Sequence, residues 1–301
     1  MTLWQLGRLS GQAAVRREIR NSVTTRSIAS AAAAPTAGDL LRQWRDLRGK
    51  SQLDLAFDTG ISQKHVSFVE TGRSTPSRQM IVDLADALRV PLRERNAIMM
   101  AAGFAPIYRD EPLDGPGMQR IGRAVKRILR QQEPFPALAM DRYWNVIETN
   151  EAAPAFFGRF VDLEKWPKPR NLLRLMFDPA GVRPHLMRWE ETAASLLARV
   201  RREAVGGAID ERTRALLAEL TAYPDAPQDA RSASTSDLLP MIPLGFQTSR
   251  GALELFSMIT TVGAPQTVTA EEIRLETMFP VDDETERDYL EFVGRGHGEG
   301  S

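Results

Sequence analysis

The 301-residue sequence predicts an all-α domain followed by an α+β domain. Three observations predict this order. Between residues 38 and 104, apolar side chains recur at helical spacing and glycines close several of the segments. Residues 105 to 117 are rich in proline and glycine, which is the composition of a boundary between domains. From Pro134 onward, short apolar runs alternate as strands do, and helical segments lie between the second run and the third.

The composition excludes some classes of protein and leaves others open. Hydrophobic residues make up 43% and charged residues 26%, as in ordinary globular proteins. The formal net charge is zero, so only a local basic patch (Lys50, Lys64, Arg73 and Arg78) supports a nucleic-acid partner. There is no cysteine for a disulfide or a thiolate zinc site, and no apolar run of about 18 residues that could span a membrane. We expect a cytoplasmic protein with no membrane span.

Residues 1 to 36 form an extension with five arginines and a single acidic residue, Glu18. An arginine-rich, acid-poor start has the composition of a mitochondrial transit peptide. It also fits a disordered extension, a start codon assigned too far upstream, or a basic arm that lies along DNA. We expect a disordered or misassigned extension, followed by domains at residues 37–104 and 118–295 with a linker at 105–117.

Residues 51 to 73 predict two short helices separated by one glycine. Ser51 and Ser62 are placed to cap them, because a serine oxygen accepts hydrogen bonds from the free amides of a first turn. Gly60 supplies the positive φ that the chain needs after the first helix. This pattern is typical of a helix-turn-helix, in which the second helix enters the major groove of DNA. We expect Trp44 and Phe57 to fill the core, since a domain of about 65 residues needs large aromatics to bury enough area.

The residues that carry this pattern are Ser51, Gln52, Leu55, Ala56, Gly60, Ser62, Ser67, Glu70, Gly72, Arg73, Pro76, Leu84, Ala85 and Leu88. With them, the segment resembles the Cro and phage-repressor (xenobiotic-response-element) type of helix-turn-helix. The resemblance implies a DNA-contacting set of Gln52, Ser62, Gln63, Lys64, His65, Ser67, Phe68, Arg73 and Arg78. Gln63, Lys64 and Phe68 fall where the family reads base edges. Gln52, Arg73 and Arg78 fall where it grips phosphate. Phe68 departs from the usual polar residue and offers apolar contact, for example to a thymine methyl.

The second domain begins with a predicted helix at residues 118 to 132, which has one apolar stripe and basic residues on its other faces. The basic faces are either solvated or lie near DNA, and the apolar stripe is a candidate for a dimer contact. Strand-like runs follow at residues 136–140, 144–149, 241–248, 252–262 and 273–279. Between the second and third runs, we expect helices capped by Asn150, Asn171 and Asp210, and a long amphipathic helix at residues 185–204. This order resembles a PAS-type sensor, in which an antiparallel sheet closes against helices around a small-molecule cavity.

A further set of residues narrows the resemblance. It comprises Ala102, Gly103, Phe104, Pro136, Ala137, Asp141, Trp144, Val146, Asn150, Ala152, Asn171, Leu172, Leu173, Met176, Phe177, Trp189 and Ala193. Together with the helix-turn-helix, these residues resemble the MmyB-like regulators over roughly residues 38 to 295. The resemblance implies a PAS-like domain that binds an apolar, fatty-acid-like ligand. The side chains suited to its cavity are Met140, Trp144, Phe156, Phe157, Met176, Phe246 and Phe256, which suit a filled core equally well.

The sequence offers little for catalysis. His65, His185 and His297 lack metal-ligand spacing, and no phosphate-binding loop or hydrolase motif occurs. Glu148 and Glu151 are the nearest approach to an acid/base pair, but carboxylates near a helix start are favoured by the helix dipole. We therefore expect no enzyme, no metal and no cofactor.

The sequence thus predicts a bacterial transcription regulator of the repressor type that acts as a homodimer on double-stranded operator DNA. An apolar ligand in the PAS-like domain would modulate its DNA binding. In the alternative, the C-terminal domain serves only for dimerisation or for docking a protein. Because residues 105 to 117 are rich in proline and glycine, we expect the DNA-binding domain to have few fixed contacts with the rest of the chain.

Overall fold

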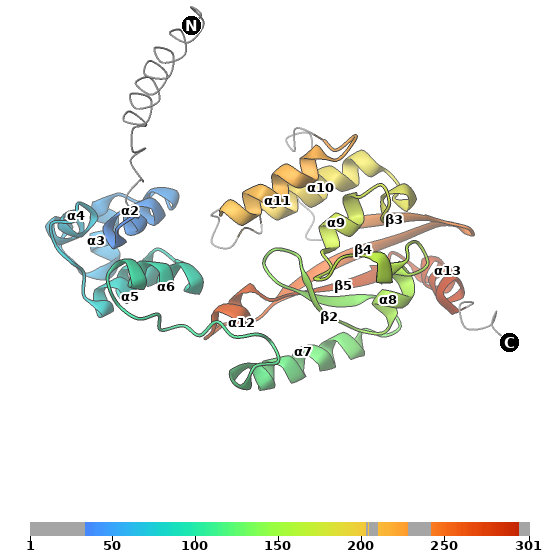
Figure 1. The fold of residues 1–301 in the computed structure, drawn as a ribbon, viewed down its shortest axis with the longest axis horizontal. Helices are drawn as coiled ribbons and strands as arrows, with labels where there is room; N and C mark the ends of the chain where they lie inside the picture. The colour runs from blue at the N-terminus through green and yellow to red at the C-terminus, as the bar shows by residue number, and fades with distance from the viewer. Residues whose placement is uncertain (1–33, 203, 205–209, 228–241, 295–301) are drawn as a thin grey trace, which may run out of the picture. The chain divides into compact units, whose positions relative to one another are not determined.

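The computed structural model describes residues 34–202, 204, 210–227 and 242–294 (Figure 1). The described residues from Ala37 onward form one compact unit, which holds both predicted domains. The prediction for the N-terminal extension falls almost entirely outside the described residues, and so does Met241 of the predicted third strand.

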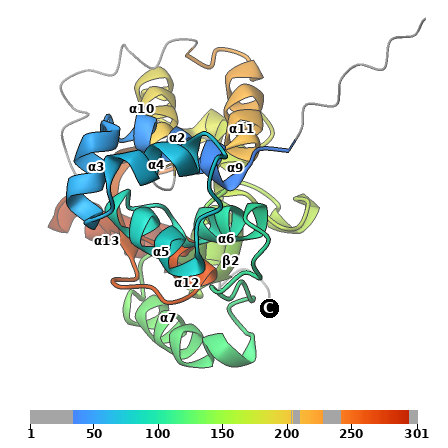
Figure 2. The same cartoon turned by 90° about the vertical axis from the view of Figure 1, so that its left-hand side faces the viewer.

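Five helices form the all-α domain: α2 (Ala37–Leu47), α3 (Gln52–Thr59), α4 (Gln63–Glu70), α5 (Arg78–Ala87) and α6 (Leu92–Ala101) (Figure 2). The predicted caps are confirmed. Ser51 and Asp54 form a capping box at the start of α3, and the Ser62 side chain accepts a hydrogen bond from the backbone amide of His65. Gly60 has a φ of 71°, so the tight turn between α3 and α4 is made by the residue that adopts this conformation without steric cost.

The core of this domain takes one apolar stripe from each helix. Its fully buried side chains include Leu41, Leu55, Val66, Val69, Ile81, Leu84, Leu88, Ile98 and Met99. Gly38 lets α2 approach α4 closely, because a Cβ atom there would lie 2.2 Å from the carbonyl oxygen of Val69. Trp44 is buried, as predicted. The prediction for Phe57 is wrong: its side chain is 88% exposed, because Leu55 and Ala56 occupy the inward side of α3 and Phe57 faces away from them.

The second domain is built on a five-stranded antiparallel sheet. Its strands are β1 (Ala137–Met140), β2 (Val146–Thr149), β3 (Ile242–Thr248), β4 (Gly251–Thr261) and β5 (Arg274–Pro280). They lie in the order β2-β1-β5-β4-β3, with every neighbouring pair antiparallel. This confirms the predicted PAS-like arrangement, in which five strands form one sheet and the helices follow the second strand.

One face of the sheet packs against α8 (Ala152–Phe157), α9 (Leu172–Phe177), α10 (Trp189–Arg202), α11 (Glu211–Ala222) and α13 (Asp283–Gly294). Asn171 and Asp210 cap α9 and α11 as predicted. Helix α10 begins later than the predicted residue 185, because Leu186 forms a β-bridge with Phe246 and Arg188 has a positive φ of 47°. The sequence did not predict α13, although its Tyr289 is fully buried in the core between the sheet and these helices.

The opposite face of the sheet is covered in part by α7 (Gln119–Gln131) (Figure 1). Val125 and Leu129 of α7 are buried with Ala137, Ala139 and Leu275 of the sheet. Most of the apolar stripe of this helix is therefore occupied within the chain, although Ile128 is 42% exposed. The dimer contact that the sequence suggested for this helix stays a prediction. No helix within the described ranges is long and apolar enough to cross a membrane.

The segment between α6 and α7 has fixed contacts, contrary to the expectation from its composition. The side chain of Asn96 donates to the carbonyl oxygen of Tyr108 at 2.7 Å and accepts from the backbone amides of Ile107 and Tyr108, each at 3.1 Å. The amide of Val268 donates to the carbonyl oxygen of Arg109 at 2.9 Å. Leu113 is buried under α7. Asn96 and Leu113 therefore give the segment between α6 and α7 fixed contacts, although its proline and glycine content predicted a flexible linker.

Candidate nucleic-acid interface and ligand-binding core

Helix α4 separates a buried side from an exposed side. Val66 and Val69 are each 1% exposed and fix the helix to the domain core. Gln63, Lys64 and His65 are exposed in its first turn, immediately after the Ser62 cap. An exposed first turn that carries amide and ammonium donors suits contacts with base edges in a major groove.

Phe68 contributes more than the apolar contact expected from the sequence. The Lys64 ammonium lies 5.5 Å from the centroid of its ring, and the Arg73 guanidinium lies 5.9 Å from it. Both distances are within the range of a cation–π interaction. The ring therefore holds two cations near each other on one surface, one for a base edge and one for phosphate by the predicted assignment.

The basic patch differs in part from its prediction. Among the described residues, Lys64, Arg73 and Arg78 form no ion pair with a carboxylate, and all three are exposed. Lys50 instead pairs with Asp58 at 2.6 Å and donates to the carbonyl oxygen of Ala87 at 3.0 Å. These two contacts connect the α2–α3 turn with α3 and with the end of α5. Lys50 therefore does not belong to the exposed basic patch.

A buried ion pair between Arg45 and Glu70 lies at the end of α4. The Arg45 guanidinium donates to both carboxylate oxygens of Glu70, at 2.7 and 3.0 Å. The hydrogen bond with Glu70 raises the pKa of Arg45. Gln52, which the sequence assigned to a phosphate contact, donates its side-chain amide to Glu70 at 2.8 Å. The end of α4 is thus tied to α2 and α3 by hydrogen bonds as well as by apolar packing.

Six of the seven predicted ligand-binding side chains come together in one cluster. Met140, Trp144, Phe156, Phe157, Met176 and Phe246 are each at most 4% exposed and pack in the core between the sheet and its helices. The ring centroid of Phe156 lies 5.3 Å from that of Phe157 and 5.0 Å from that of Phe246. Phe256 is separated from this cluster. Because side chains alternate along β4, it lies on the other face of the sheet and stacks on Phe279 at 5.3 Å.

A charged group that the sequence did not predict lies inside this core. Arg199 on α10 is 3% exposed and lies 5.1 Å from the centroid of the Trp144 ring. It donates to the hydroxyl of Ser257 at 3.2 Å and to the carboxylate of Glu276 at 3.3 Å. A buried charge is tolerated only when it is paired in this way. The available signal was an arginine on the apolar side of an amphipathic helix, between Leu196 and Val200.

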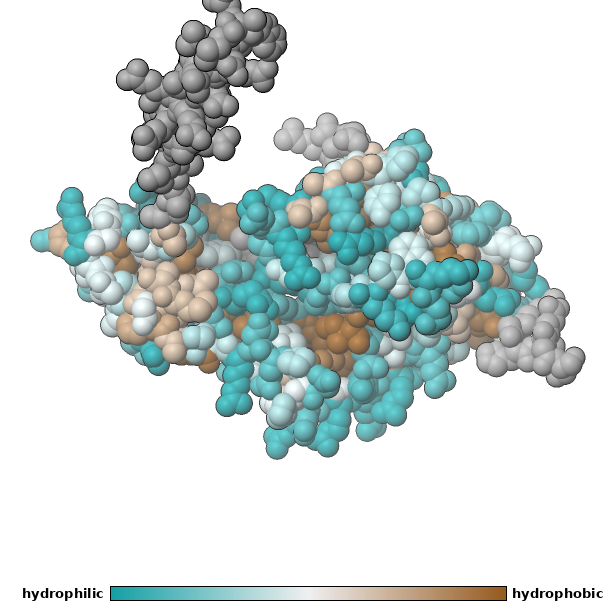
Figure 3. All heavy atoms as spheres, in the orientation of Figure 1, coloured by the Kyte–Doolittle hydropathy of each residue, from teal (hydrophilic) through white to brown (hydrophobic). Residues whose placement is uncertain are grey.

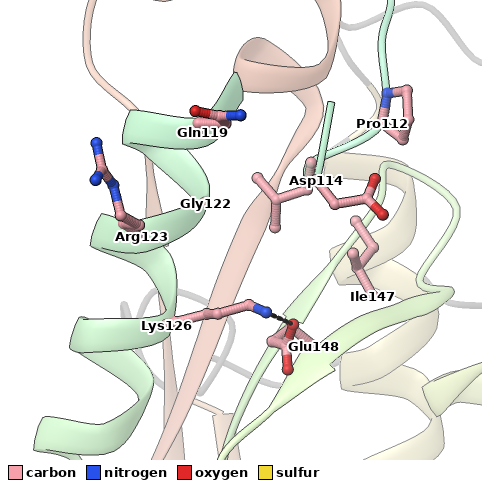
Figure 4. A pocket seen from close by; sticks show the side chains of 9 residues that line it. Pro112, Asp114, Gln119, Gly122, Arg123, Lys126, Ile147 and Glu148 are labelled. Atoms are coloured by element: carbon pink, nitrogen blue, oxygen red, sulfur yellow. Dashed lines mark ion pairs between the residues drawn. The ribbon is translucent and has the colours of Figure 1, made fainter. Parts of the chain in front are cut away.

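An open pocket of about 440 Å³ lies outside this core, between the α6–α7 segment, α7 and β2 (Figure 4). Figure 3 shows polar residues over α7. The pocket lining is mixed: Leu113 and Ile147 are apolar, whereas Asp114, Arg123 and Lys126 are charged. At its wall, Lys126 of α7 forms an ion pair with Glu148 of β2 at 3.2 Å. Glu148, half of the candidate acid/base pair, therefore serves to hold α7 on the edge of the sheet.

The geometry defines a class: a DNA-binding regulator with a helix-turn-helix domain and a PAS-like domain. Family models agree with both parts. Residues 41–95 match a helix-turn-helix family, and residues 121–290 match the MmyB-like transcription regulator ligand binding domain. The second match covers more than half of the sequence, so the chain belongs to the MmyB-like transcription regulators.

Two solved structures show weak similarity. The PAS domain of an HTR-like protein from Haloarcula marismortui aligns with a TM-score of 0.23 and 10% identity, covering 54% of this chain and 96% of that one. An RNA-binding light-oxygen-voltage receptor aligns with a TM-score of 0.26 and 12% identity, covering 94% of this chain and 68% of that one. Scores this low carry no argument about fold or function. A comparison with curated proteins found no match.

Proposed function

We propose that this protein is a cytoplasmic bacterial regulator that binds operator DNA through α4, and that an apolar, fatty-acid-like molecule in its PAS-like domain modulates that binding. The observation that carries the proposal is the exposed first turn of α4, with Lys64 and Arg73 free of carboxylate partners among the described residues. This surface lies in the same chain as an MmyB-like ligand-binding domain.

The core of the PAS-like domain supports the proposed ligand chemistry. Its large aromatic and methionine side chains would surround an alkyl chain, as apolar pockets for small molecules do. Arg199 lies beside Ser257 in this core, and arginine and hydroxyl donors recognise a carboxylate. Because Arg199 is already paired with Glu276 at 3.3 Å, a ligand carboxylate would bind there by taking the place of Glu276. An unbranched fatty acid has both an alkyl chain and a carboxylate.

Titration with myristate and palmitate tests the proposal. Trp144, Trp166 and Trp189 lie in or against the core, so binding there should change tryptophan emission saturably. The affinity for operator DNA should then change by about 5- to 150-fold, the usual range of coupling between two sites. The methyl esters of the same acids are the matched control for the carboxylate. If no acid changes the emission, or if one binds without changing operator affinity, the C-terminal domain is instead a module for dimerisation or protein docking.

We also propose that the protein acts as a homodimer. One recognition helix contacts too few bases to specify a site in a genome, so such domains act in pairs on two half-sites. On the same side of the sheet as α7, the part that α7 leaves uncovered carries apolar side chains that suit a second copy: Met258 and Val281 are 43% and 45% exposed, near the stacked Phe256 and Phe279.

Sedimentation measurements test this surface. Met258→Asp should raise the dimer dissociation constant about tenfold or more, since burying an unpaired carboxylate costs several kcal/mol. Met100→Asp is the matched control, because Met100 is 57% exposed on a different domain and should leave dimerisation unchanged. A wild-type protein that remains monomeric on operator DNA would contradict the homodimer. A dimer that Met258→Asp leaves intact would place the contact elsewhere.

A further inference from the structure

A cluster of charged groups joins the first turn of α6 to the PAS-like domain. Glu272, the last residue of α12 (Val268–Glu272), accepts two hydrogen bonds from Arg93 of α6, at 2.7 and 2.9 Å. The same carboxylate accepts one from Arg142 in the β1–β2 turn, at 2.9 Å. Arg142 also reaches Glu94 of α6 at 3.2 Å. We call Arg93, Arg142 and Glu272 the α6–α12 clamp.

The clamp is shielded from water, although it consists of charges. The side chain of Arg142 is 2% exposed and that of Glu272 is 8% exposed, whereas that of Arg93 is 39% exposed. Hydrogen bonds between ionised groups in such surroundings are strong. Arg93 also pairs with Asp110 at 2.6 Å, and Arg142 also pairs with Asp210 at 2.9 Å. Burial also raises the pKa of Tyr143, the next residue, to about 12, so its hydroxyl stays protonated and donates to Asp210 at 3.0 Å.

Both clamp residues of the PAS-like domain lie on segments that also reach its core. Arg142 is two residues before Trp144 in the β1–β2 turn, and Glu272 is four residues before Glu276 on β5. In the core, Arg199 contacts both of these inward side chains, the Trp144 ring at 5.1 Å and the Glu276 carboxylate at 3.3 Å. The β1–β2 turn and the segment of residues 272–276 are therefore connected twice. Arg199 connects them in the core, and the clamp connects them where the domain meets α6.

We propose that the α6–α12 clamp is the contact through which the state of the core controls the DNA-binding domain. The proposal assigns DNA binding to the arrangement with the clamp formed, in which the outer face of α4 is exposed. A ligand that moves Arg199 displaces Trp144 and Glu276, which shifts the segments that carry Arg142 and Glu272 and weakens the clamp. The inference rests on the proposed function, because a ligand changes DNA affinity only through its different affinities for the two arrangements.

The test uses the full chain with two clamp variants. Arg93→Ala removes the partner that is more exposed and leaves Glu272 paired with Arg142, so the fold should be kept. Glu272→Gln removes the shared carboxylate. Glu219→Gln is the matched control, because Glu219 forms a similar two-bond pair with Arg174, at 2.7 and 2.9 Å, within the PAS-like domain.

Hydrogen exchange and operator affinity are measured for each protein. Both clamp variants should exchange faster in the first turn of α6, where the amide of Leu92 donates to Glu271 at 2.7 Å. Their operator affinity should fall by about 5- to 150-fold, while the control behaves like wild type. Wild-type exchange in both variants, or faster exchange with unchanged operator affinity, overturns the inference. A wild-type protein with no sequence-specific site overturns the proposed function instead, and the exchange rates then decide whether the clamp holds α6.

Discussion

Replacing Glu70 with alanine should lower the free energy of unfolding of the DNA-binding domain by about 1–3 kcal/mol, the usual cost of leaving buried donors without an acceptor, since Arg45 keeps its ion pair with Asp46 at 2.9 Å. The Glu70 side chain is 3% exposed and that of Arg45 is 10% exposed, so water cannot replace the lost carboxylate. The substitution also leaves the Gln52 amide without its acceptor. Urea unfolding of the full chain, followed by hydrogen exchange in α2 and α4, measures the change.

The control for Glu70→Ala is Asp58→Ala, which breaks the Lys50–Asp58 pair. That pair has a similarly short distance of 2.6 Å, but its side chains are 32% and 38% exposed. An ion pair open to solvent contributes about 0–1 kcal/mol, so this variant should remain close to wild type. Equal losses from the two substitutions would show that burial of the Arg45–Glu70 pair does not govern the stability of the domain.

Gln63→Ala and Lys64→Ala should each weaken binding to the specific operator by about 1–3 kcal/mol, the usual value of a side chain that contacts a base edge. Both side chains are exposed in the first turn of α4, and their removal leaves no buried group unpaired. Fluorescence anisotropy with the operator and with a scrambled duplex measures the loss. Binding to the scrambled duplex should change little, because these contacts specify sequence rather than position the protein.

Arg73→Ala provides the contrast to these two variants. A phosphate contact should weaken binding to both duplexes and reduce the slope of log affinity against log salt by about 1. Gln79→Ala is the control, since Gln79 is exposed on α5 and bonds only Asp83 among the contacts described. If Gln63→Ala and Lys64→Ala bind the operator like wild type, α4 does not read the sequence.

The sequence predicted the helix-turn-helix well because its signals are local. Ser51, Gly60 and Ser62 each act on amides or dihedral angles within a few residues, so their effect is visible without the rest of the fold. The prediction that Phe57 is buried was wrong. Its size suggested a core position, but the direction of its side chain depends on which side of α3 meets α2 and α4.

The PAS-like domain shows the limit of pattern analysis more clearly. Alternation along each strand predicted the five strands, but it did not decide which alternate set faces the helices, and Phe256 was grouped with Phe246 for that reason. The composition of residues 105 to 117 predicted a loose linker. The pairing of Asn96 with Ile107 and Tyr108 gives that segment its fixed contacts instead.

By itself, the sequence determined the order of the two domains, most of the caps of their helices and the exposed first turn of α4. Only the tertiary structure decided the ion pairs that connect and support these parts. Arg93 and Glu272 are 179 positions apart, and Arg199 and Glu276 are 77 positions apart. Local propensity carries no information about such pairs, because a buried charge is stable only beside the particular partner that folding brings to it.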